Sequence, residues 1–159
     1  MTTPRIAALA LALATALTAC GRPAAQRSNV AGDSAAQPAA EPMACRLVTL
    51  DELRTITGLD LKAGMQTADY QGYSICQWDK AAGGAALTLV VNQNGNFFNY
   101  QNVPGAVPLS GLGEDAVWNP QVHQMGVQLP KGTMSVNFLS EPFERKWAEQ
   151  IAKTALGRL

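Results

Sequence analysis

The spacing of hydrophobic and polar residues changes several times along the 159-residue chain. Residues 6–16 form an apolar stretch rich in Leu and Ala, and residues 21–43 are rich in Ala, Pro, Gln and Ser with no aromatic side chain. Regular apolar spacing begins only after this stretch. One folded domain is therefore expected over residues 44–159, a length that suits a single small core.

Apolar residues at helical spacing first occur in the segment 47–58. Leu53 and Ile56 fall on one helical face, Thr49 is a suitable N-cap, and Gly58 is a suitable end. This pattern predicts a short amphipathic helix that packs on the core.

A longer helix is predicted over residues 141–159, with Ser140 as its N-cap and Pro142 in its first turn. Its apolar stripe consists of Phe143, Trp147, Ile151 and Ala155. The opposite face mixes acidic and basic residues. The stripe is therefore expected to cover a sheet and not to insert into a membrane.

Alternating residues between these helices predict antiparallel strands. Residues 73–78 and 85–92, joined by a glycine-rich turn, predict one hairpin, and residues 122–139 predict a second hairpin. Residues 109–118 predict a tight turn that leads into a strand. We expect an α+β fold: an antiparallel sheet of about four to five strands packed by an N-terminal short helix and a C-terminal helix.

The stretch Leu17-Thr18-Ala19-Cys20 follows the apolar run directly, and Arg5 precedes it. This arrangement is typical of an exported chain, and residues 1–19 are expected to be a removable signal peptide. The stretch resembles the lipobox of bacterial lipoproteins, in which the cysteine is lipidated. Plain secretion is the alternative, but the order of Leu, a small residue and Cys favours lipidation of Cys20.

Residues 20–43 are accordingly interpreted as a lipidated cysteine followed by a flexible tether, because this composition cannot bury enough apolar area to fold. Acyl chains of the palmitate type on Cys20 would provide a stable membrane anchor. The expected location is the cell envelope, with the domain facing the periplasm or the exterior. The absence of Asp after Cys20 favours the outer membrane where one exists.

Two cysteines, Cys45 and Cys76, remain once Cys20 is assigned to lipid. In an exported chain a disulfide between them is the favoured interpretation. A redox pair is an alternative, although the chain has no C-x-x-C arrangement. A metal site would have only His123 to add to the two sulfurs.

Charge and motif content argue against several functions. Basic and acidic residues number twelve each, so no electrostatic basis for nucleic-acid binding exists. The single histidine, His123, has no nucleophile in a recognisable relation, and adjacent Glu114 and Asp115 would face opposite ways in a strand. No phosphate-binding loop occurs. We expect no enzyme activity, no metal and no cofactor.

Residues 92–102 interleave amide side chains with aromatic rings and could contact a sugar or a peptide. The alternative is a turn followed by a short helix or strand whose rings point inward. Trp78 is near Cys76 in sequence, which favours a core role in which its ring covers the crosslink. The candidate ligand-binding residues are Trp78, Phe98, Tyr100 and Trp118.

With these residues placed, the chain resembles a family of small bacterial cell-envelope lipoproteins of unknown function. The resemblance includes the lipobox and tether, Cys45 before a helix ending in Gly58, Cys76-Gln77-Trp78, and Gly111-Leu112-Gly113-Glu114-Asp115-Ala116. It implies an α+β sandwich with an antiparallel sheet, a Cys45–Cys76 disulfide, and no established catalytic residues.

Together these observations predict a membrane-anchored envelope lipoprotein whose non-catalytic domain binds another envelope component, either a protein or part of the cell wall. The alternative is a carrier or sensor domain for a small lipid, saccharide or peptide.

Overall fold

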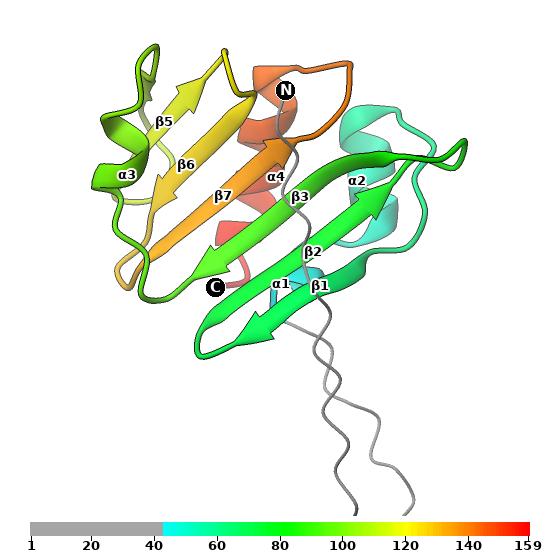
Figure 1. Ribbon diagram of the computed structural model, residues 1–159, viewed down its shortest axis with the longest axis horizontal. Coiled ribbons are helices and arrows are strands. Elements are labelled where there is room, and N and C mark those ends of the chain that lie inside the picture. Colours follow the sequence, from blue (N-terminus) through cyan, green and yellow to red (C-terminus); the bar gives the residue numbers. More distant parts are fainter. Residues whose placement is uncertain (1–42) are drawn as a thin grey trace, which may run out of the picture. The chain divides into compact units, whose positions relative to one another are not determined.

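The computed structural model describes residues 43–159, and a single antiparallel sheet of seven strands runs through this part of the chain (Figure 1). The strand order is β1-β2-β3-β7-β6-β5-β4, and every neighbouring pair is antiparallel. The strands are β1 (Met65–Tyr70), β2 (Tyr73–Asp79), β3 (Ala85–Asn92), β4 (Val107–Leu109), β5 (Asp115–Asn119), β6 (Gln124–Gln128) and β7 (Thr133–Phe138).

The α+β class and the antiparallel sheet are confirmed, but the expected number of four to five strands is too low. The two additional strands, β1 and β4, form the edges of the sheet. Strand β1 is exposed along nearly its whole length, so its sequence shows no apolar alternation. Strand β4 has only three residues, including Pro108. Edge strands of this kind leave little hydrophobic pattern to detect.

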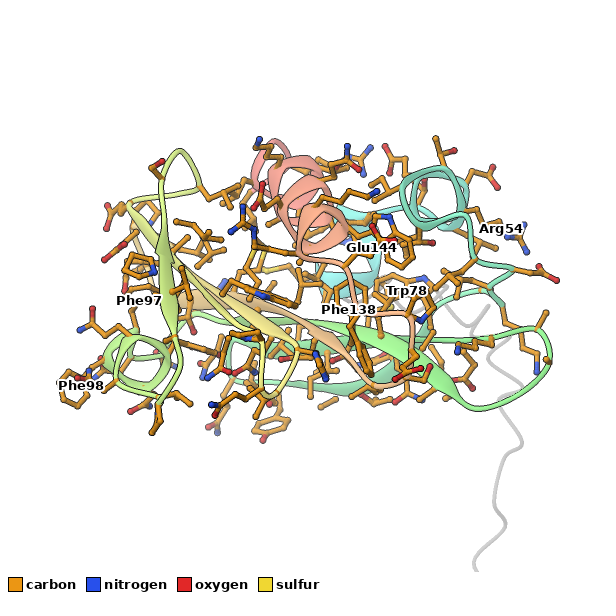
Figure 2. All side chains as sticks on the ribbon, turned by 90° about the horizontal axis from the view of Figure 1, so that it is seen from above. Arg54, Trp78, Phe97, Phe98, Phe138 and Glu144 are labelled. Atoms are coloured by element: carbon orange, nitrogen blue, oxygen red, sulfur yellow. A yellow bond between two sulfur atoms is a disulfide. The ribbon has the colours of Figure 1, made fainter. Side chains whose placement is uncertain are left out.

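Helices lie on both sides of the sheet (Figure 2). Three of them, α1 (Met43–Leu47), α2 (Leu50–Thr57) and α4 (Arg145–Leu156), cover one face. The fourth, α3 (Phe98–Gln101), lies on the other face, which we call the open face. Figure 1 is viewed onto the open face, with α2 and α4 behind the sheet.

The capping residues of α2 are those expected from the sequence. Thr49 Oγ1 accepts a hydrogen bond from Glu52 N, and Glu52 Oε2 accepts one from Thr49 N at 2.8 Å. Gly58 ends the helix with a φ of 67°. The predicted start after Thr49 is confirmed, whereas Leu47, which the sequence pattern places with this helix, belongs to α1.

Helix α4 begins later than its sequence pattern predicts. Its N-cap is Glu144 and not Ser140, and the chain from residue 141 to residue 144 is not helical. The physical reason is that Phe143 leaves the helical line and stacks on His123, with 3.6 Å between ring centroids and 8° between ring planes. The predicted stripe is otherwise confirmed, since Trp147, Ile151 and Ala155 are buried.

The main core lies between α1, α2, α4 and the sheet. Strand side chains that point toward the helices are almost completely buried. Phe138 of β7 meets Trp147 of α4 with 6.3 Å between ring centroids. Figure 2 shows Phe138 and Trp78 in this layer, below the helices. The seam between α4 and the middle of the sheet is therefore filled by side chains.

Candidate functional site

Cys45 and Cys76 form a disulfide that links α1 to β2. The Cα atoms are 5.0 Å apart, within the ordinary range for a disulfide. Trp78 lies beside this crosslink, because a Cβ atom added to Gly64 would be 2.7 Å from both Cys76 Sγ and Trp78 Nε1. The predicted disulfide and the core role of Trp78 are confirmed. Cys20, the predicted lipidation site, lies outside the described residues.

The four aromatic residues proposed to bind a ligand do not come together. Trp78 and Trp118 belong to the core on the helix-covered face, in strands separated by β3, β7 and β6. Phe98 and Tyr100 belong to α3, on the open face. Phe98 is 58% exposed, whereas Tyr100 is half-buried. A common binding groove built from these four rings is therefore not present in the structure.

Helix α3 covers part of the open face. The ring of Tyr100 lies over Gly126, so that a Cβ atom on Gly126 would be only 2.5 Å from Tyr100 Cγ. Phe97 is buried beside Tyr100, with 6.2 Å between ring centroids. Val117, which pairs with Gly126, is also buried although it is not part of the main core. The inward-pointing ring expected as an alternative for residues 92–102 is thus found at Phe97.

Polar side chains form a row across the rest of the open face. The strand register places Gln77, Thr88, Asn137 and Gln124 side by side on β2, β3, β7 and β6. Residues directly opposite one another in neighbouring strands share a face of the sheet. We call these four residues the amide row. Their neighbours along each strand, such as Leu87 and Val136, point into the core.

Hydrogen bonds connect three members of the amide row, Gln124, Asn137 and Thr88. Asn137 Nδ2 donates to Thr88 Oγ1 at 3.0 Å, and Asn137 Oδ1 accepts a hydrogen bond from Gln124 Nε2. Gln77 Nε2 donates to Asp79 Oδ1 at 2.9 Å at the other end of the row. Asn137 is thereby held between its neighbours, and each row amide keeps further donor or acceptor capacity. The row is a fixed, polar surface that includes no charged side chain.

A groove of about 480 Å³ opens at the C-terminal end of α4, on the helix-covered side of the sheet. Its apolar lining includes Met43, Val91, Leu129, Leu156 and Leu159. A neighbouring hollow of about 320 Å³ shares Met43 and Leu159 and adds Arg46 and Arg158. Pockets for small molecules commonly have volumes of about 300–1,000 Å³. The groove is therefore large enough for a small ligand, whereas the middle of the α4 seam is not.

The titratable groups show one strongly shifted pKa, and it belongs to a surface ion pair. Hydrogen bonds from Arg158 are the main cause that lowers the pKa of Glu52 to about 2, and the bond from Thr49 N adds to the effect. His123 stacks on Phe143. Within residues 43–159, no three His, Cys, Asp or Glu side chains lie close enough together to hold a metal ion.

Sequence reasoning missed both the amide row and the groove. The four members of the amide row each alternate with core residues along their own strand. Sequence reasoning could have assigned them to one face of the sheet only with the strand register known. The groove had no such pattern, because its walls come from four separate segments.

The described helices are short, and none of those in residues 43–159 has the length and apolar character needed to cross a bilayer. Comparison with known proteins adds no relative to this picture. No family model matches the chain, and no curated protein or solved structure is significantly similar to it.

Proposed function

We propose that this protein is a membrane-anchored envelope lipoprotein whose non-catalytic α+β domain binds another envelope component through its open face. The observation that supports this proposal most directly is the amide row, a line of amide and hydroxyl side chains across four neighbouring strands of the open face. The lipobox-like stretch ending in Cys20 supports the anchor, and the Cys45–Cys76 disulfide agrees with an oxidising compartment.

The chemistry of the row favours a partner that is uncharged and rich in hydroxyl or amide groups. Each amide both donates and accepts hydrogen bonds, as does the Thr88 hydroxyl. The carboxylate of Asp79 at one end of the row accepts hydrogen bonds and disfavours an anionic partner. The hydroxyl and acetamido groups of the sugars in cell-wall glycan have these properties, and we infer that this glycan is the preferred partner over an envelope protein.

Binding to isolated cell-wall glycan, measured by co-sedimentation, tests this proposal. Gln124→Ala removes one end of the row and is expected to weaken binding about threefold to tenfold, the equivalent of one or two neutral hydrogen bonds. Gln150→Ala is the matched control, because Gln150 is an exposed glutamine on α4, on the other side of the sheet. Equal binding by both variants and the unmodified chain would exclude the open face as the binding surface.

The anchor is tested separately. Mass spectrometry of the membrane-extracted protein is expected to find Cys20 as the first residue, with acyl chains attached. Cys20→Ser is expected to release the protein from the membrane fraction, whereas Thr18→Ser is expected to leave it there. An unmodified amino terminus in the unmodified chain would refute the lipoprotein assignment without affecting the test of the open face.

A second candidate function, a small-ligand carrier, is favoured by the groove at the end of α4. Its apolar walls differ in character from the polar open face, so the two surfaces suit different ligands.

A further inference from the structure

The groove at the C-terminal end of α4 combines a buried apolar floor with an accessible mouth. Val91 and Leu129 are almost completely buried and form its deeper part. Met43 and Leu156 are half-buried, and Leu159 is 53% exposed. The groove therefore presents apolar surface to solvent at the end of an otherwise filled seam. Ligand pockets are typically concave and lined mainly by apolar side chains with a few polar groups.

Positive side chains stand at both ends of this apolar surface. Lys131 lines the groove on the β6–β7 turn, and Arg46 and Arg158 line the adjoining hollow. Neither lining includes a carboxylate side chain among the described residues. Of the three basic residues, Arg158 is hydrogen-bonded to Glu52, which neutralises its charge. Among the described lining residues of the groove and the hollow, the charged side chains are all basic.

We propose that this groove binds a long-chain fatty acid, with the acyl chain along the apolar floor and the carboxylate at Lys131. The apolar residues match the chain, and the cations match a single negative head group. Since the groove lies on the helix-covered side, this site is distinct from the amide row, and it does not depend on binding at the open face.

The charge pattern separates this ligand from other occupants. The protein's own acyl anchor would be joined through ester and amide bonds and would have no negative charge for Lys131 to meet. A second copy of the domain would present the same positive groups and would bring like charges together. A long-chain fatty acid matches both features of the groove, because its acyl chain is apolar and its free carboxylate is negative.

The test uses a chain that begins at residue 21, which contains every described element and the disulfide but not the proposed anchor residue. A fluorescent fatty acid is titrated into this protein and displaced with palmitate, with hexadecanol of equal chain length, and with lysophosphatidylcholine. Palmitate is expected to displace the probe at least about tenfold more effectively than hexadecanol, because one charge-assisted contact is worth about that factor. Equal displacement by acid and alcohol, or none by palmitate, would overturn the proposal.

Variants locate the site. Lys131 lies in an exposed turn. Lys131→Glu is expected to weaken palmitate binding about tenfold or more, because it reverses a charge at the rim of the groove. Lys62→Glu makes the same charge change at an exposed lysine outside both linings, and it is expected to leave binding unchanged. Leu159→Ser reduces the apolar mouth at an exposed position and is expected to weaken binding of palmitate and hexadecanol alike. If both lysine variants behave alike, the carboxylate does not bind at Lys131.

Discussion

Arg158 donates hydrogen bonds to both carboxylate oxygens of Glu52, with 2.8 Å between Nη1 and Oε2 and 2.5 Å between Nη2 and Oε1. The same guanidinium donates to the backbone oxygen of Leu47 at 2.8 Å. Because Glu52 also belongs to the capping box at Thr49, one carboxylate connects the start of α2 to the residues after α4. The hydrogen bond to Leu47 joins α1 to the residues after α4, and both segments border the proposed fatty-acid groove.

The Glu52–Arg158 pair predicts a specific pH dependence of stability. The pKa of Glu52 falls from 4.5 to about 2 in the folded chain, so the pair stabilises the fold above about pH 4.5 and loses this effect as the pH falls toward 2. Glu52→Gln keeps a side chain that can complete the capping box but removes the charge. The difference in melting temperature between the unmodified chain and this variant is expected to be largest near pH 7 and to vanish near pH 2. A difference independent of pH would contradict this prediction.

The disulfide is expected to provide a large share of the stability of this small domain. It closes a loop with a sequence separation of 31 residues, for which chain entropy predicts about 3–4 kcal/mol. Replacing both Cys45 and Cys76 by Ala should reduce the free energy of unfolding by this amount in urea titrations. Reductant should lower the unfolding midpoint of the unmodified chain and leave that of the double variant in place. Insensitivity of the unmodified chain to reductant would argue against the crosslink.

Gly126→Ala is expected to destabilise the domain by about 1–3 kcal/mol, because the new methyl group would overlap the ring of Tyr100. The cost should be smaller in a Tyr100→Ala background, where no ring stands in the way. A double-mutant cycle from denaturant unfolding measures this coupling. Additive effects of the two substitutions would mean that Tyr100 does not lie over Gly126.

Ile151→Ala tests the filled seam between α4 and the sheet. Ile151 is completely buried, and its truncation is expected to cost about 2–5 kcal/mol of unfolding free energy. Lys153→Ala, on the exposed side of the same helix, is the control and should change stability by less than about 0.5 kcal/mol. A small effect at Ile151 would indicate an open seam and would move the apolar binding site into the middle of α4.

Local rules predicted the parts of the fold that depend on neighbouring residues. Helix α2 begins after Thr49 and ends before Gly58, as the capping properties of these residues require. The stripe containing Trp147 and Ile151 is buried, as its spacing indicates. The same rules failed at Ser140, where stacking of Phe143 on His123 delays the start of α4. They also failed at β1, which has no buried face to produce an alternating pattern.

The amino-acid sequence by itself determined the α+β class, the helical stripes, the hairpins and the pairing of two of the three cysteines, because these follow from periodicity, turn residues and cysteine count. Only the tertiary structure decided which polar residues share the open face and where apolar surface stays accessible. The amide row depends on the register of four strands, and the groove depends on the meeting of α1, α4, β3 and the β6–β7 turn. Such contacts join residues far apart in the chain, so no local pattern encodes them.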